Sequence, residues 1–208
     1  MSIIKLNNQG VKNATAFGSI TGLGSMVFIK KLTASSSATL SFVDGASSVV
    51  LDNTYKEYLF TFKNIHPASE NPNFAFNLSI DSGSNYNIAK TTTFFRAQHG
   101  ESGNGGELGY EASLDLAQGT GVQKISQAAG NDNDQGVSGI LHLFNPSSTT
   151  FVKHFICKTN NVLKYSEPYA YNNYIAGYGN TTSAVDAIQF SFSSGNMDSG
   201  DICLYGIA

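Results

Sequence analysis

The sequence carries little charge, and arginine is its scarcest basic residue. Charged residues make up 13% of the 208 positions, and Arg96 is the single arginine beside eleven lysines and fifteen acidic residues, which leaves a net charge of -3. A protein that neutralises about 6 to 10 phosphates needs a clustered basic surface, and bidentate recognition of bases favours arginine. We therefore expect no nucleic-acid partner and a surface covered by neutral polar side chains.

Long apolar runs are also missing. No segment approaches the ~20 apolar residues that a membrane-spanning helix needs, and the first residues lack the apolar stretch of a signal peptide. We expect synthesis in a cytoplasm and no insertion into a membrane.

Cysteine is rare, and its spacing is uninformative about metals. Cys157 and Cys203 both lie inside segments that pattern as strands, and they do not form a C-x-x-C pair. Two buried free thiols are the favoured interpretation, and a bridge between neighbouring strands is the alternative.

Sequence motifs of catalysis and cofactor binding are missing as well. The chain contains no H-E-x-x-H, G-x-S-x-G, G-x-G-x-x-G or phosphate-loop motif. We therefore expect no enzymatic activity, no cofactor and no metal. Three weaker alternatives stay open: a metal pair formed by His142 and His154, an irregular calcium site in residues 131–136, and a glycosidase carboxylate pair. The carboxylate candidates are Glu101, Glu107, Glu111 and Asp115.

The loop at residues 131–136 only superficially resembles a calcium-binding loop. An EF-hand loop aligned on Gly136 has Asn131, Asn133 and Gln135 at its first, third and fifth positions, and His142 at the twelfth position, where the bidentate Glu belongs. The negative charge is missing where a calcium ion needs it, so a solvated turn is the favoured interpretation.

What the sequence does contain is a repeated alternation of apolar and polar residues. In residues 74–80 every second side chain is large and apolar, which is the period of a strand with one buried face. The pattern predicts an all-β fold with about nine or ten strands and almost no helix, arranged as an antiparallel, jelly-roll-like β-sandwich. Strands are expected over residues 26–32, 38–44, 55–63, 74–80, 91–97, 137–144, 150–158, 185–192 and 201–205.

Three further expectations concern the organisation of the chain. Residues 1–25 form either an arm that docks on another molecule or an irregular first strand and loop, and residues 26–208 form a single β-sandwich domain. Residues 33–37 are expected to join the first two strands as a hairpin. Residues 98–136 read as a long glycine-rich loop, a kind of segment that is often functional.

Tyrosine is concentrated in one segment. Five of the ten tyrosines fall within fourteen residues that also contain Asn and Gly: Tyr165, Tyr169, Tyr171, Tyr174 and Tyr178. This composition is typical of adaptable binding surfaces, and the rings suit stacking on sugars. The alternative is that they cap the edge of the sandwich or lie in a subunit interface. In either case this cluster is the best candidate for a contact surface.

Three stretches of the chain together resemble a known group of proteins. They are residues 4–10 (IKLNNQG) leading into 28–35 (FIKKLTAS), residues 139–146 (GILHLFNP), and residues 193–196 (SSGN) with 200–207 (GDICLYGI). The chain resembles virion structural proteins of marine tailed bacteriophages, such as those of cyanophages and pelagiphages, over nearly its whole length.

The resemblance implies a non-enzymatic virion component. Its expected place is the virion surface, either as a head decoration protein or as a compact tail or fibre component. Its expected partners are other virion proteins and further copies of itself, with a trimer as the expected state. A carbohydrate-binding module that attaches to a host-surface glycan is the alternative function, and it is compatible with a place on the virion.

Overall fold

The fold is built from strands alone. The computed structural model describes residues 25–164 and 167–208, and this part of the chain contains twelve strands and no helix. The strands are β1 (Met26–Thr33), β2 (Leu40–Val43), β3 (Glu57–Pro67), β4 (Phe74–Ser79), β5 (Lys90–Gly100), β6 (Glu107–Tyr110), β7 (Gln123–Lys124), β8 (Gly136–Phe144), β9 (Lys153–Lys164), β10 (Pro168–Gly179), β11 (Ala187–Phe192) and β12 (Met197–Ile207).

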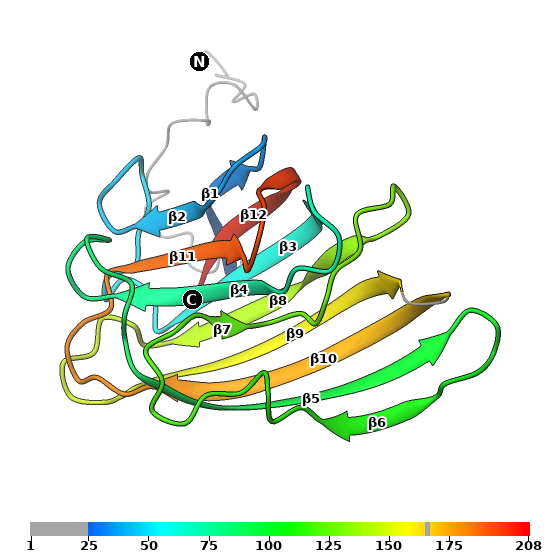
Figure 1. Cartoon of the computed structure of the whole chain (residues 1–208). Helices are drawn as coiled ribbons and strands as arrows, with labels where there is room; N and C mark the ends of the chain where they lie inside the picture. Colours follow the sequence, from blue (N-terminus) through cyan, green and yellow to red (C-terminus); the bar gives the residue numbers. More distant parts are fainter. Residues whose placement is uncertain (1–24, 165–166) are drawn as a thin grey trace, which may run out of the picture.

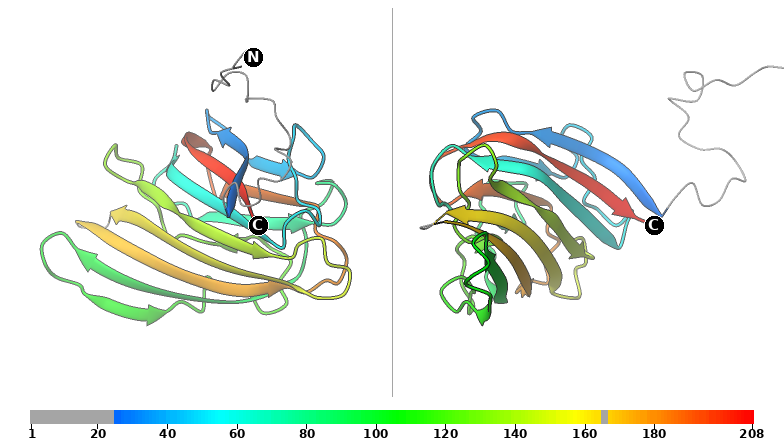
Figure 2. Two further views of the ribbon diagram at one scale, coloured as in Figure 1. Left: turned by 180° about the vertical axis from the view of Figure 1, so that it is seen from behind. Right: turned by 90° about the vertical axis from the view of Figure 1, so that its right-hand side faces the viewer.

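The strands form two packed antiparallel sheets. The large sheet has the order β1-β12-β3-β8-β9-β10-β5-β6, and the small sheet has the order β2-β11-β4-β7 (Figure 1). The large sheet twists and curves, and the small sheet covers only part of it (Figure 2). The predicted antiparallel β-sandwich is confirmed.

The connections interleave the two sheets as in a jelly roll. The chain stays in one sheet between β5 and β6 and from β8 through β9 to β10, and it crosses to the other sheet at every other connection. As a result β1 pairs with β12, and β2 pairs with β11, so the two ends of the described chain meet. The predicted hairpin through residues 33–37 is therefore wrong, because β1 and β2 belong to different sheets.

All nine predicted strands are present, and three more were missed. β6 and β7 lie inside the segment that was interpreted as a loop, and β10 occupies the tyrosine-rich segment. β7 has only two residues, which is too short for a period to be visible. β10 was missed because the aromatic side chains occupy both of its faces, so large and small residues do not alternate.

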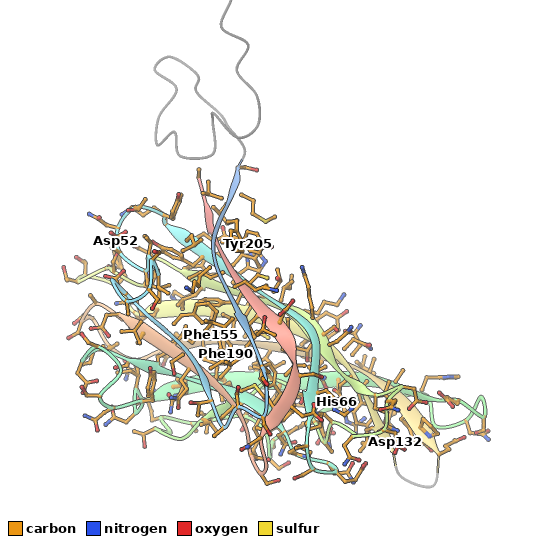
Figure 3. The ribbon with its side chains drawn as sticks, turned by 90° about the horizontal axis from the view of Figure 1, so that it is seen from above. Asp52, His66, Asp132, Phe155, Phe190 and Tyr205 are labelled. Atoms are coloured by element: carbon orange, nitrogen blue, oxygen red, sulfur yellow. The ribbon has the colours of Figure 1, made fainter. Side chains whose placement is uncertain are left out.

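Phenylalanine dominates the core between the sheets. The ring of Phe190 on β11 lies 5.2 Å from that of Phe62, 5.5 Å from that of Phe60 and 5.9 Å from that of Phe74, measured between centroids. Phe155 on β9 packs edge-on against Phe76, and both Phe155 and Phe190 are labelled in Figure 3. Edge-to-face and offset contacts of this kind are the favoured arrangement of buried rings.

The segment after β6 covers the inner face of the large sheet where the small sheet ends. Polar side chains of that face bond to its backbone: Asn161 Nδ2 donates to Gln127 O at 2.8 Å, and the hydroxyl of Thr159 donates to Ile125 O. Thr92 Oγ1 donates to Gln123 Oε1 at 2.7 Å. Part of the segment at residues 98–136 therefore serves the interior of the protein, since these buried hydrogen bonds attach it to the sheet.

Strand β4 is buried on both faces, although its alternation predicted one wet face. Phe74, Phe76 and Leu78 face the large sheet, and Asn77 on the other side is also buried. Asn77 Nδ2 donates to Tyr86 O at 2.6 Å and to Thr120 O at 3.1 Å, so two loops cover this side of the strand. The polar side chain is satisfied by backbone carbonyls instead of water.

Both cysteines are buried free thiols. Cys157 lies on β9 and Cys203 on β12, and the strands β8 and β3 separate them in the sheet. The favoured interpretation is confirmed, and a bridge between neighbouring strands is wrong.

The predicted arm of residues 1–25 falls almost entirely outside the described residues, so the division at residue 25 stays a prediction. In the described part of the chain, no helix is long and apolar enough to cross a membrane.

Candidate functional site

The candidate site lies on the outer face of the large sheet, the face that points away from the small sheet. Side chains of neighbouring strands meet there in cross-strand rows. One row runs through Phe28, Tyr205, Leu59, His142, Ile156 and Ala176, on β1, β12, β3, β8, β9 and β10. A second row runs through Ile140, Lys158, Tyr174, Phe95 and Tyr110, on β8, β9, β10, β5 and β6. Between them the two rows involve all eight strands.

Large apolar side chains on this face are exposed to solvent. The exposed fractions are 54% for Ile156, 57% for Phe28 and 57% for Tyr110. The sequence neighbours of Ile156 on the inner face, Phe155 and Cys157, are buried. The alternation of these strands therefore places apolar residues on both faces, and contiguous apolar surface of this kind marks an interaction site in soluble proteins.

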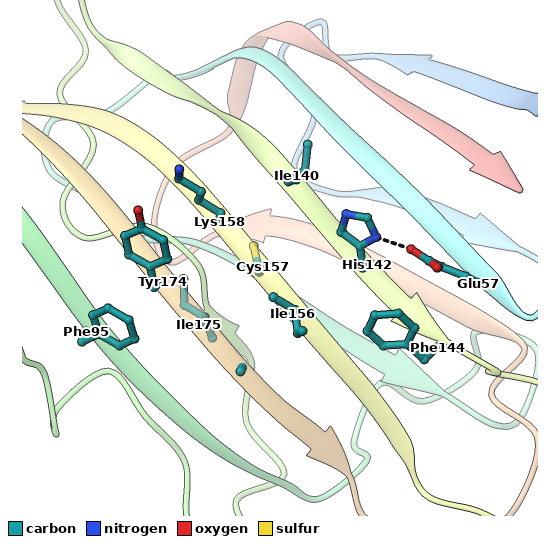
Figure 4. Close-up of a pocket in the computed structure, with 11 residues that line it drawn as sticks. Glu57, Phe95, Ile140, His142, Phe144, Ile156, Cys157, Lys158, Tyr174 and Ile175 are labelled. Atoms are coloured by element: carbon teal, nitrogen blue, oxygen red, sulfur yellow. Dashed lines mark hydrogen bonds and ion pairs between the residues drawn. The ribbon is translucent and has the colours of Figure 1, made fainter. Parts of the chain in front are cut away.

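The centre of the outer face is a groove of about 580 Å³. We call it the outer groove, and its apolar lining includes Phe95, Ile140, Phe144, Ile156 and Tyr174 (Figure 4). The rings of Phe95 and Tyr174 stack nearly parallel, with centroids 5.0 Å apart and an interplanar angle of 6°. This pair forms one wall of the groove, and β8 carries the side chains of the opposite side.

Few polar groups border the outer groove. His142 Nδ1 contacts the carboxylate of Glu57, an interaction drawn in Figure 4. The ammonium group of Lys158 lies 5.1 Å from the centroid of the Tyr174 ring, within the range of a cation–π contact. One acidic and one basic side chain thus lie on the two sides of a lining that is otherwise apolar.

The five candidate tyrosines do not share one surface. Tyr165 lies outside the described residues. Tyr171 points to the inner face of β10, where it is buried beneath the guanidinium of Arg96, 5.0 Å from its ring centroid. Tyr169 has the same orientation on the strand as Tyr171 and is half-buried. Of the four described tyrosines, Tyr174 and Tyr178 belong to the outer face, because successive side chains of a strand alternate between faces.

Three of the four carboxylates considered for glycoside hydrolysis contact other side chains, and Glu101 lies at an exposed position. Glu111 Oε1 lies 2.7 Å from Arg96 Nε, and Glu107 Oε2 lies 3.6 Å from Arg96 Nη1. Asp115 accepts a hydrogen bond from the hydroxyl of Tyr110, which raises the pKa of that tyrosine. Glu107 and Glu111 are thus oriented by one guanidinium rather than facing an open cleft.

A second, polar cavity of about 600 Å³ lies beside the loop at residues 131–136. His66 Nδ1 lies 2.9 Å from Asp198 Oδ1, and His66 Nε2 lies 3.1 Å from Asp132 O (His66 and Asp132 are labelled in Figure 3). Residues 132–135 form a turn closed by a bond from Gln135 N to Asp132 O at 2.9 Å. Among the described residues no group of three or more His, Cys, Asp or Glu is arranged to hold a metal.

His142 and His154 do not form a pair. His142 is paired with Ile156 across β8 and β9, and it contacts Glu57. The ring of His154 packs against Tyr178, with centroids 6.0 Å apart. Each histidine has its own neighbour on the outer face.

Sequence reasoning missed most of the outer groove. Phe95, Ile140 and Ile156 each lie next to a buried residue within a predicted strand, so they were treated as part of the strand pattern. The available signal was the presence of large apolar residues at consecutive positions, such as Phe94 with Phe95, Ile140 with Leu141, and Phe155 with Ile156. Consecutive apolar residues in a strand predict that both faces of the sheet are covered.

Comparison with known proteins gives no family for this chain. No protein-family model, no curated protein and no solved structure matched it.

Proposed function

We propose that this chain is a non-enzymatic structural protein of a tailed-phage virion, mounted on the particle surface. It acts there as a head decoration protein or as a compact tail or fibre component. It works by self-association, with a trimer as the expected state, and by docking on other virion proteins. The resemblance of the sequence to virion proteins of marine tailed phages motivates the biological setting.

The observation that carries the structural role is the exposed apolar outer face. Within residues 25–164 and 167–208, no layer of structure covers this face of the eight-stranded sheet, which presents Phe28, Ile156 and Tyr110 to solvent. Permanent assemblies bury surfaces of this composition, since their interfaces resemble a protein core that has been divided. The low charge of the chain and its aromatic core agree with a rigid building block.

Mass spectrometry of purified virions tests the proposal. We expect peptides of this chain in particles of the phage that encodes it, at a copy number that is a multiple of a symmetric oligomer. The matched control is the lysate of the infected cells. A chain that is abundant in the lysate and missing from the particles contradicts the proposal.

A carbohydrate-binding role is the second candidate, and the outer groove supports it. Stacked aromatic rings with exposed edges, bordered by Lys158 and by the Glu57–His142 pair, combine apolar contact with hydrogen-bonding groups at one site. A glycan array tests this role. The matched control is Phe151→Ala, which removes an exposed aromatic ring outside the groove. Glycan binding that is lost in Tyr174→Ala and retained in Phe151→Ala supports the carbohydrate-binding role. Unchanged binding in Tyr174→Ala removes the groove from consideration.

A further inference from the structure

We infer that the outer face of the large sheet is the surface by which copies of this chain bind each other, and that the same face contributes on both sides of the contact. The inference rests on the self-association in the proposed function and names its surface. A contact of one face with itself is two-fold, so it gives a dimer in place of the expected trimer. Four features of the described residues support it.

The first feature is the extent of the apolar surface. The two cross-strand rows connect edge strand β1, with Phe28, to edge strand β6, with Tyr110. Leu108, also on the outer face of β6, is 73% exposed. A sheet buries an apolar face by packing it on another layer of structure, and the small sheet is already used on the other side.

The second feature is the contrast with the outer face of the small sheet. The side chains there are small or polar: Ser41 and Val43 on β2, Gln189 and Ser191 on β11, and Ala75, Asn77 and Ser79 on β4. Gln189 donates a hydrogen bond to Ser41 Oγ at 3.0 Å, and Asn77 donates to the backbone carbonyls of Tyr86 and Thr120. This sheet does not offer a second apolar face that could cover the first.

The third feature is the charge of the outer groove. Glu57 and Lys158 balance each other, and each already has a neighbour on its own chain, His142 and Tyr174 respectively. Near one edge of the sheet, Lys31 Nζ lies 3.2 Å from Asp201 Oδ2. When two copies meet through this face, no cluster of like charges on one copy faces the same cluster on the other. A strongly charged partner, in contrast, finds no patch of opposite charge here.

The fourth feature is the shape of the face. A groove of about 580 Å³ in the middle of the face leaves room for side chains of a facing copy. Ile156 lines the groove and is 54% exposed. In a two-fold symmetric contact, the same patch on each copy forms one side of the interface.

Two isoleucine variants test the inference. Ile156→Lys places a charge in the centre of the outer face, and Ile80→Lys is the matched control, because Ile80 is 41% exposed and follows β4 of the small sheet. By sedimentation or light scattering we expect the unaltered chain and Ile80→Lys to be oligomers, and Ile156→Lys to dissociate about 100-fold more readily or to be a monomer. Circular dichroism and the melting temperature show that each variant is folded.

A mixing experiment distinguishes one shared face from two different surfaces. When tagged Ile156→Lys chains are mixed with unaltered chains, mixed oligomers should be missing if both partners use the same face. If the contact joined the outer face to a different surface, the variant would still offer that second surface, and mixed oligomers would form. Mixed oligomers therefore overturn the inference.

Three other outcomes also overturn the inference. The first is an unaltered chain that is monomeric at about 100 μM, a concentration at which specific homodimers are assembled. The others are a folded Ile156→Lys chain that remains an oligomer, and equal dissociation of the Ile156→Lys and Ile80→Lys variants. A monomer that is nevertheless found in virions leaves the proposed virion role intact and removes only its self-association. An oligomer that is missing from virions contradicts only the proposed function.

Discussion

The side-chain nitrogen of Lys90 lies 2.5 Å from Asn77 Oδ1 and joins the first residue of β5 in the large sheet to the middle of β4 in the small sheet. The same nitrogen donates to Ile88 O at 2.7 Å, and both side chains are buried. Burial lowers the pKa of Lys90 from 10.5 to about 8, because the charged form is removed from water. This contact ties the two layers together and makes the stability of the protein depend on pH.

The pH dependence has a definite sign. Between pH 8 and 10.5 the unfolded chain holds a proton on Lys90 that the folded chain has lost, so this group makes the free energy of unfolding rise with pH. The rise is about 3 kcal/mol at most over this window. Urea titrations at a series of pH values give the free energy of unfolding of the unaltered chain and of Lys90→Met. The difference between these two free energies, plotted against pH, measures the contribution of Lys90. A difference that is constant from pH 8 to 10.5 would contradict the assignment.

Phe190 is the residue whose truncation we expect to damage the core most clearly. Its ring contacts those of Phe60, Phe62 and Phe74 and bridges the two sheets. Phe190→Ala should lower the free energy of unfolding by about 3 to 5 kcal/mol, since it removes buried area and leaves a cavity. The control is Phe151→Ala, whose ring is 66% exposed and whose loss should cost about 0.5 kcal/mol or less. Chemical denaturation compares the two, and similar losses would show that the core is organised differently.

Asn161 should hold the segment after β7 against the large sheet. It donates to Gln127 O and accepts a hydrogen bond from Asn173 Nδ2, both at 2.8 Å, and it is fully buried. Asn161→Ala should cost about 1 to 3 kcal/mol, because Gln127 O and Asn173 lose their buried partner. Hydrogen exchange should become faster in residues 125–130, whereas Asn133→Ala, at an exposed position, should leave it unchanged. Unaltered exchange in Asn161→Ala would mean that other contacts attach this segment.

The two thiols should be inert in the folded protein. Cys157 and Cys203 are both buried, and burial raises the pKa of Cys157, so little of the reactive thiolate forms. A thiol reagent at pH 8 should label neither residue in the native protein and both in the presence of denaturant. Rapid labelling of the native chain would indicate that these strands open readily.

Strand positions could be predicted from the sequence where one face is apolar and the other polar. Residues 185–192 show this pattern because their large apolar side chains meet the core on one side only. The prediction failed for β10, where Tyr171 and Ile175 face the interior while Tyr174 and Tyr178 face outward. A strand with large residues on both faces loses its period, and a tyrosine-rich segment of this kind looks like a loop.

The candidate site was predictable only in part. Tyr174, one of the candidate contact residues, lines the outer groove, but its neighbours Phe95, Ile140 and Ile156 come from β5, β8 and β9. They are distant in the sequence and become neighbours through strand pairing. Tyr171 was grouped with Tyr174 by sequence distance, although a difference of three residues on a strand places two side chains on opposite faces.

The sequence by itself determined that this protein is built from strands, that its surface is poor in charge and that its interior is rich in phenylalanine. These properties are local or compositional, and alternation and residue type express them directly. Only the tertiary structure decided which sheet each strand joins. Backbone hydrogen bonds are alike for every pair of strands, so the choice depends on how the side chains of the whole chain pack together. That choice placed Phe28 and Ile156 in one row, and it turned consecutive apolar residues in separate strands into a continuous outer face.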